Sequence, residues 1–194
     1  MNATTNPQPW LPVRRTLLSE AEIQTKVGDL ARRIDADYRQ APELLLVGVL
    51  RGAFIFLADL ARRLTIPNRI DFMALSSYAA GPNPDTSPAD TLNPGAVRLV
   101  MDLRSDIAGR HVLVVEDIID TGHTLRYLLN LLAARHPASL RTCALLRKPS
   151  RLEVEAPVDY LGFDIPDAWV VGYGLDYLDQ HRTLPYVGVV EPRG

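Results

Sequence analysis

The residues that could do chemistry are concentrated between positions 112 and 124, in the stretch VLVVEDIIDTGHT. Glu116 and Asp117 are adjacent carboxylates. Such a pair can bind the neighbouring hydroxyls of a ribose, either directly or through a divalent metal ion. Asp120 follows in the same stretch. Acids beside a phosphate would repel the ligand, so we expect them to have a binding role of their own.

The residues after Asp120 have the composition of a phosphate-binding loop. Gly122 lets the backbone approach a ligand closely, and Thr121 and Thr124 offer hydroxyl groups. A helix that begins here would add unpaired N–H groups and a partial positive charge. The alternative is that Asp120 or Thr121 only caps the helix, which would leave the two adjacent acids unexplained.

A buried strand before the acids and a helix after the loop would position these groups. Residues 112–115 are apolar and mostly β-branched, as in a strand covered on both faces. Leucines then recur at helical spacing: Leu125, Leu128, Leu129, Leu131 and Leu132. The predicted order is strand, short acidic loop and helix. In an open α/β sheet, ligands bind at the carboxyl ends of the strands.

The same order recurs earlier in the chain. Residues 43–50 (ELLLVGVL) predict a strand, Arg51-Gly52-Ala53 a turn, and FIFLADLARRL a helix. The turn could hold an anion through free amides, and an ordinary connection explains the spacing equally well. Further strands are expected at 70–76, 96–103, 140–146, 158–163 and 186–190, and a helix with a capping box at 19–38. This alternation predicts a single α/β unit.

Length and composition exclude several classes of protein. The 194 residues suffice for one domain with a full core. A formal net charge of -2 and a pI near 6.1 disfavour a general nucleic-acid binder. The single cysteine, Cys143, excludes an internal disulfide framework and a cysteine-rich zinc site. Without an apolar stretch of transmembrane length or a signal-peptide pattern, we expect a cytoplasmic protein.

Two segments are set apart from the rest. Residues 1–13 are polar and proline-rich and should form a flexible N-terminal tail, which leaves residues 14–194 as the domain. Residues 77–97 contain four prolines and two glycines, and this segment is long for a connection in a compact domain. We interpret it as a hairpin that closes over a site. A disordered excursion is the alternative, although a lid must also be loosely held.

The stretch VLVVEDIIDTGHT resembles the phosphoribosyl-pyrophosphate (PRPP) motif of the type I phosphoribosyltransferases, which is a hydrophobic strand, two acids and a D-T/S-G-x-T loop. VGVLRGAFIFLADL, SSY, LLRKPS and IPDAWVVGYGLDY also occur in family order. From about Leu17 to Val190 the chain resembles the hypoxanthine-guanine phosphoribosyltransferases of bacterial type. The resemblance implies an α/β fold: a mostly parallel twisted sheet flanked by helices, with a small hood and a mobile lid hairpin.

The resemblance assigns residues to PRPP. Glu116 and Asp117 would bind the ribose hydroxyls, partly through Mg²⁺, and Asp176 would bind a second Mg²⁺ ion. Four residues would hold the 5′-phosphate: Thr121, Gly122, His123 and Thr124. Four residues would bind the pyrophosphate: Leu50, Arg51, Gly52 and Arg182. The first peptide bond of the loop at 50–52 is often cis in this family.

Other matching positions would handle the purine. Asp120 would face N7 as the general base, and Lys148 would contact the 6-oxo group. Trp169 would stack on the base and Val170 would bind it through the backbone. Separately from the purine contacts, Ser77 and Tyr78 would lie on the closing lid. Lys148 can donate to O6 but cannot accept from a 6-amino group, so it should select 6-oxopurines over adenine.

The implied activity is purine salvage. A 5-phosphoribosyl group would pass from PRPP to N9 of hypoxanthine or guanine, giving IMP or GMP and pyrophosphate, with Mg²⁺ as cofactor. Relatives of this fold form homodimers or homotetramers, and we expect one of these. Two alternatives stay open. One is a regulatory protein of the same fold that binds nucleotide or PRPP and controls nucleic acid, and the other is an enzyme that prefers xanthine.

The chain departs from the family pattern at two positions. Arg51 stands where many relatives have lysine, a change that binding of pyrophosphate by backbone amides would tolerate. His123 stands where lysine or an apolar residue is common. Histidine titrates near neutral pH, so His123 could make phosphate binding depend on pH.

Overall fold

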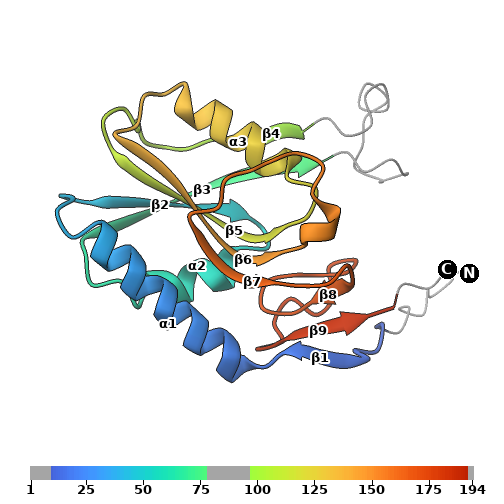
Figure 1. Ribbon diagram of the computed structural model, residues 1–194. Coiled ribbons are helices and arrows are strands. Elements are labelled where there is room, and N and C mark those ends of the chain that lie inside the picture. Colours follow the sequence, from blue (N-terminus) through green and yellow to red (C-terminus); the bar gives the residue numbers. More distant parts are fainter. Residues whose placement is uncertain (1–9, 78–96, 192–194) are drawn as a thin grey trace, which may run out of the picture.

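Figure 1 shows the computed structural model of the protein, which describes residues 10–77 and 97–191. The main sheet contains β2 (Leu44–Leu50), β3 (Asn68–Ser77), β4 (Val97–Met101), β5 (His111–Ile119), β6 (Ser139–Arg147) and β7 (Tyr160–Asp164). The strand order is β4-β3-β2-β5-β6-β7. β4 runs antiparallel to β3, and the other neighbouring strands are parallel. The predicted mostly parallel sheet is therefore confirmed.

Helices cover both faces of this sheet (Figure 1). α1 (Glu20–Asp37) and α2 (Phe54–Ala61) pack on one face, and α3 (His123–Ala133) packs on the other. Neighbouring residues of one strand enter different cores: Leu113 packs with α1 and α2, and Val114 packs with α3. Successive side chains of a strand point to opposite faces. A strand covered on both faces must therefore be apolar throughout, which is why the run at 112–115 predicts it.

The first helix begins as its sequence predicts. The backbone N–H of Glu22 donates to the Ser19 hydroxyl at 3.3 Å, and the Glu22 carboxylate accepts from the Ser19 N–H at 2.8 Å. This reciprocal pair is the predicted capping box. Among the helices that the structure describes, none is both long and apolar enough to cross a membrane.

A second sheet, the hood, lies beside the carboxyl-end side of the main sheet (Figure 1). It contains β1 (Arg15–Leu18), β8 (Trp169–Val171) and β9 (Val187–Val190) in the antiparallel order β1-β9-β8. We did not predict β1. Just before it, the N–H of Leu11 donates to Gln180 Oε1 at 3.2 Å. Leu11 is also buried, so this part of the expected tail packs on the rest of the protein.

The end of β5 differs from the prediction. We placed Glu116 and Asp117 in a loop, and this is wrong, because β5 continues to Ile119. Glu116 lies opposite Ala144 of β6, and Ile118 lies opposite Leu146. Pairing with β6 therefore holds both acids on the rigid end of a central strand.

The predicted hairpin is present where the structure describes it. The backbone of Ser77 at the end of β3 pairs with that of Val97 at the start of β4, antiparallel. Residues 78–96, which include Tyr78, lie outside the described residues. The assignment of Ser77 and Tyr78 to a closing lid stays a prediction.

Candidate active site

The connections after β2 and β5 meet at one edge of the sheet, and two adjoining cavities open there. The first follows the end of β5 and its connection to α3, including Glu116, Asp120 and Thr124. The second lies between the loop after β2 and the hood, and it includes Arg51 and Arg182. Both cavities are lined by Leu50, Leu75, Asp117 and Ile118. Residues expected to bind PRPP therefore share one continuous site.

The acids at the end of β5 are held in an unfavourable environment. Glu116 is buried, and this burial, together with the charge of Asp117, raises its pKa well above the ordinary value. Burial raises the pKa of Asp117 to about 6, an effect that Arg182 opposes and Asp176 reinforces. Arg182 is itself paired with Asp176 at 2.7 Å. Three acids and one arginine therefore leave this part of the site with more carboxyl groups than cations.

A divalent cation would stabilise the ionised form of these buried acids. Mg²⁺ is usually held by one or two carboxylates and by substrate phosphates, without a dedicated protein cage. Within residues 10–77 and 97–191, no group of three or more His, Cys, Asp or Glu side chains could hold a metal ion. The residues present therefore suit a Mg²⁺ ion that shares its ligands with a phosphorylated substrate.

The phosphate loop, residues 121–124, leaves the start of α3 open. The N-cap is Gly122, whose φ of 87° is in the left-handed region that favours glycine, and no side chain caps the helix. The interpretation that Asp120 or Thr121 only caps the helix is therefore wrong. The carbonyl of Thr121 accepts from the N–H groups of Glu153 at 3.0 Å and Val154 at 3.2 Å. The free amides of α3 can bind an anion.

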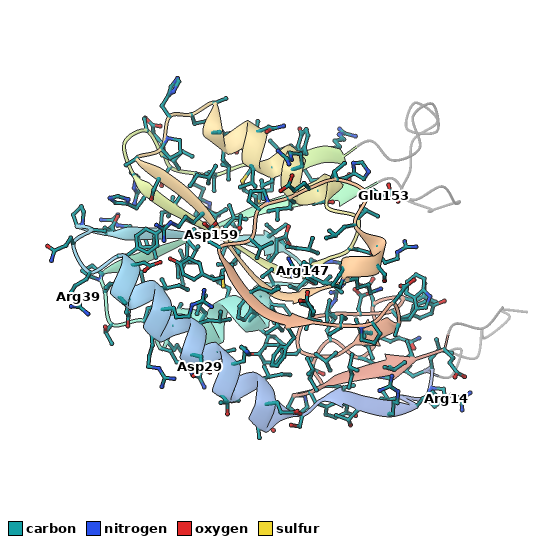
Figure 2. The ribbon with its side chains drawn as sticks, viewed as in Figure 1. Arg14, Asp29, Arg39, Arg147, Glu153 and Asp159 are labelled. Atoms are coloured by element: carbon teal, nitrogen blue, oxygen red, sulfur yellow. The ribbon has the colours of Figure 1, made fainter. Side chains whose placement is uncertain are left out.

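A segment after β6 supports this loop from outside. The Nε2 atom of His123 lies 3.0 Å from a carboxylate oxygen of Glu153. Figure 2 shows Glu153 on the side where α3 begins, and Arg39 at the opposite end of the sheet. The effect of His123 on phosphate binding stays a prediction, and Glu153 is the charged group that faces it.

The loop after β2 has a close backbone approach on each side. The peptide between Leu50 and Arg51 is cis, as the resemblance implies. A Cβ atom at Gly52 would lie 1.6 Å from Asp117 Oδ2, and one at Gly174 would lie 1.9 Å from the Gly52 carbonyl oxygen. A side chain at Gly174 would clash with the backbone, and one at Gly52 would displace the Asp117 carboxylate, so Gly52 is held between β5 and the hood.

Two arginines border this loop. Arg182 donates to the Gly174 carbonyl at 2.8 Å and is paired with Asp176. Arg51 is exposed and lies 3.1 Å from a carboxylate oxygen of Asp179. The side chain of Arg182 therefore lines the cavity from the hood, where it can neutralise an anion bound by the loop.

Four charged side chains gather beside the first cavity, at the ends of β5 and β6. Arg151 Nε donates to Asp120 Oδ1 at 3.0 Å, and Lys148 Nζ lies 3.9 Å from Asp120 Oδ2. Lys148 Nζ is also 3.5 Å from Asp167 Oδ1. The predicted residues Asp120 and Lys148 are thus close together. Arg151 and Asp167 were missed, because their contacts join residues far apart in sequence.

The two remaining purine-binding candidates lie on β8. Trp169 is 60% exposed, so it does not serve core packing. Its ring and that of Tyr177 are nearly perpendicular, with ring centroids 5.6 Å apart. Val170 is buried and pairs with Val189 in the hood. Neither residue lines the two cavities described above.

Comparisons with known proteins agree with this geometry. Residues 15–178 match the family model described as "Phosphoribosyl transferase domain". A hypoxanthine-guanine phosphoribosyltransferase from Dictyostelium discoideum is 45% identical over 178 residues, which is 90% of this chain and 94% of the relative. A hypoxanthine phosphoribosyltransferase from Salmonella typhimurium is 46% identical over 175 residues, which is 90% of this chain and 93% of the relative.

A solved structure shows the same likeness in three dimensions. The crystal structure of a hypoxanthine-guanine phosphoribosyltransferase from Bacillus anthracis matches with a TM-score of 0.83 at 37% identity. The match covers 94% of this chain and 100% of that one. Sequence and fold therefore place both cavities within a known enzyme architecture.

Proposed function

This chain belongs to the hypoxanthine-guanine phosphoribosyltransferases of the phosphoribosyltransferase family, and we propose that it converts a 6-oxopurine and PRPP into IMP or GMP and pyrophosphate, in purine salvage. The following paragraphs assign the steps of this reaction to residues of the two cavities and of the charged cluster beside them.

PRPP occupies the edge of the sheet between the two cavities. The open N-terminus of α3 and the hydroxyls of Thr121 and Thr124 bind the 5′-phosphate. The loop at 50–52 and Arg182 bind the pyrophosphate. Asp117 lines both cavities, so with Glu116 it lies where the ribose connects the two phosphate groups.

One Mg²⁺ ion would be held by Glu116 and Asp117 and a second by Asp176, each together with oxygens of the substrate. When bound, these ions supply positive charge that stabilises the pyrophosphate leaving group. Arg182 contributes charge to the same leaving group from the hood. The support for these assignments is the set of buried carboxyl groups at this end of the site, whose pKa values burial raises and a bound cation would lower.

The purine is read by Asp120 and Lys148, and this pair carries the proposal. Their side chains lie 3.9 Å apart on neighbouring strand ends. N7 and O6 are neighbouring atoms on one edge of a 6-oxopurine. Lys148 donates to O6, while the Asp120 carboxylate takes the proton that the purine must lose. A 6-amino group cannot accept from Lys148, so adenine is rejected.

A panel of bases tests this function. Purified protein would be incubated with PRPP and Mg²⁺, and separately with hypoxanthine, guanine, xanthine, adenine and uracil, while nucleotide formation is followed. We expect turnover of 6-oxopurines and at least 100-fold lower kcat/KM for adenine. Preference for xanthine would change the substrate. Binding of PRPP without turnover of any base would favour a regulatory protein, and equal use of adenine would contradict the role of Lys148.

We also propose a homodimer or homotetramer. Apolar side chains are exposed on neighbouring parts of the sheet and at the start of α2: Phe54, Ile70, Val100 and Met101. Such side chains favour association with another copy. Light scattering at working concentration should give at least twice the mass of one chain, and a monomer would contradict this proposal.

A further inference from the structure

Two cations and two carboxylates alternate around the purine-reading pair. Lys148 is buried, whereas the side chains of Asp120, Arg151 and Asp167 are about half exposed. Asp120 comes from the β5–α3 connection, Lys148 and Arg151 from the end of β6 and the turn after it, and Asp167 from the β7–β8 connection. Three separate connections therefore bring a locally neutral set of charges to one point.

Within this set, Asp120 and Lys148 each lie nearer to another charged side chain than to each other. Asp120 is 3.0 Å from Arg151 and 3.9 Å from Lys148. Lys148 is 3.5 Å from Asp167 and 3.9 Å from Asp120. Arg151 occupies Oδ1 of Asp120 and leaves Oδ2 on the side that faces Lys148.

The backbone fixes the position of Arg151 relative to Lys148. The turn Pro149–Arg151 is a single 3-10 turn whose N-cap is Lys148. The N–H of Arg151 donates to the Lys148 carbonyl at 3.1 Å, and the N–H of Lys148 donates to the Ile119 carbonyl at 2.9 Å. The backbone of Arg151, which carries the guanidinium side chain, is therefore fixed one turn beyond Lys148.

A direct ion pair between Asp120 and Lys148 would impair recognition of the purine. The base arrives uncharged and must accept a hydrogen bond from Lys148 while giving its proton to Asp120. If the two side chains closed on each other, the base would have to separate them before binding. Partners of opposite charge on their outer sides oppose this closure, because Asp120 and Lys148 each have a nearer partner.

We propose that Arg151 and Asp167 are positioning residues that hold Asp120 and Lys148 apart, so that both face the purine. The inference rests on the proposed roles of Asp120 and Lys148. It assigns to Arg151 and Asp167 no contact with the reacting atoms. It requires that their loss weakens the use of the base more than the use of PRPP.

Steady-state kinetics of single variants test this. Arg151→Ala should raise the KM for hypoxanthine about 10-fold and change the KM for PRPP less than about 2-fold, because only the base must separate the collapsed pair. Arg151→Lys keeps the charge and should stay within about 3-fold of wild type. Asp167→Asn should raise the KM for hypoxanthine about 5-fold.

The double variant gives a sharper result. Once Asp120 and Lys148 have closed on each other, loss of the second outer partner has little further effect. Arg151→Ala/Asp167→Asn should therefore resemble the worse single variant, whereas independent contributions would multiply to about 50-fold in the KM for hypoxanthine. Multiplication of the two effects would contradict the shared role.

Arg147 and Asp164 provide a matched control. They form a two-bonded ion pair one residue before Lys148, at 2.7 and 3.0 Å, between β6 and β7. Arg147→Ala removes an arginine from the same strand end without touching Asp120 or Lys148, and the KM for hypoxanthine should change less than about 2-fold. An equal effect of Arg147→Ala and Arg151→Ala would overturn the inference.

Two further variants separate this inference from the proposed function. Asp120→Asn and Lys148→Gln should lose turnover and base affinity, respectively, in the same assay. If both retain wild-type kinetics, the proposed purine site is wrong. If they are impaired while Arg151→Ala keeps the wild-type KM for hypoxanthine, or raises both KM values equally, only the positioning role fails.

Discussion

The two carboxylates at the end of β5 and the one in its connection to α3 have opposite charge environments. Glu116 and Asp117 are at the end of the strand, where burial raises their pKa values and acids outnumber arginines. Asp120 comes three residues later, half exposed, with Arg151 and Lys148 beside it. The first region has too few cations, and the second has as many cations as carboxylates.

The difference follows from the charges of the two substrates. PRPP binds together with magnesium, so the acids that bind its ribose need no neutralising cation from the protein. The purine arrives uncharged, so the residues that read it must be neutralised by the protein itself. We infer a division of labour in which Asp117 serves PRPP binding and Asp120 serves the proton transfer.

The largest effect is expected at Asp120. Asp120→Asn keeps the size of the side chain and removes the base, so kcat should fall about 10²- to 10⁴-fold. The KM for PRPP should change little, because Asp120 is not among the groups assigned to phosphate. Rapid-quench measurement of nucleotide formation checks this. Retention of wild-type kcat would remove the distinction between the two regions.

Gly52→Ala probes the first region in the same way. The added Cβ would overlap Asp117 Oδ2, so the carboxylate must move. The KM for PRPP should rise about 10- to 100-fold, with a much smaller change for hypoxanthine. Gly28 is the control, because nothing lies within 4 Å of a Cβ there. Gly28→Ala in α1 should leave kinetics unchanged and raise the free energy of unfolding by about 0.5–1 kcal/mol.

The gain in stability from Asp117→Asn, relative to wild type, should depend on pH. The ordinary pKa of aspartate is 3.8, and burial raises that of Asp117 to about 6. The folded protein therefore binds a proton more tightly than the unfolded chain. The burial of Asp117 thus has no effect on the free energy of unfolding well below pH 4, and it lowers that free energy by its full amount above about pH 6. Without Mg²⁺ and PRPP, Asp117→Asn should gain up to about 3 kcal/mol in free energy of unfolding at pH 7.5, the equivalent of a shift of about two pKa units.

Urea unfolding at two pH values measures this gain. It should shrink as the pH falls through 4 and approach zero near pH 3, where the wild-type carboxyl is protonated in both states. A variant that is less stable than wild type at pH 7.5 would show that the folded protein already neutralises Asp117. The contrast between the two regions would then be lost.

The smallest effect concerns salt. Arg151, the nearer partner of Asp120, is about half exposed, and salt screens exposed charges. Between about 0.05 and 0.5 M NaCl, with PRPP saturating, the KM for hypoxanthine should rise about 2-fold in wild type. The rise should be absent in Arg151→Ala, which has already lost the screened contact. The same salt response in both proteins would show that Arg151 does not act through its charge.

Much of the fold was predictable because it depends on local patterns. β2 and residues 112–115 of β5 are continuous apolar runs, and the capping box at Ser19 and Glu22 marks the start of α1. β1 was not predictable from its own residues, because it is only four residues long and its partner β9 is far along the chain. Pairing between strands so far apart in the sequence is defined only in the folded protein.

The site was predictable to a similar degree. The acids at 116, 117 and 120 stand out by type and position, but acids are uncommon in strands, so the extension of β5 through Glu116 and Asp117 was missed. Pairing with β6 outweighs that preference. Arg151 and Asp167 look like ordinary surface charges in the sequence. Their significance depends on the distances to Asp120 and Lys148, which only the folded chain defines.

Calorimetric titration of PRPP with Mg²⁺ tests the division of labour most directly. Wild type, Asp117→Asn and Asp120→Asn would be titrated without a purine, so that only binding is measured. Asp120→Asn should bind PRPP within about 3-fold of wild type, while Asp117→Asn should bind at least about 30-fold more weakly. Equal losses in the two variants, or wild-type affinity in Asp117→Asn, would contradict the separation of the two regions.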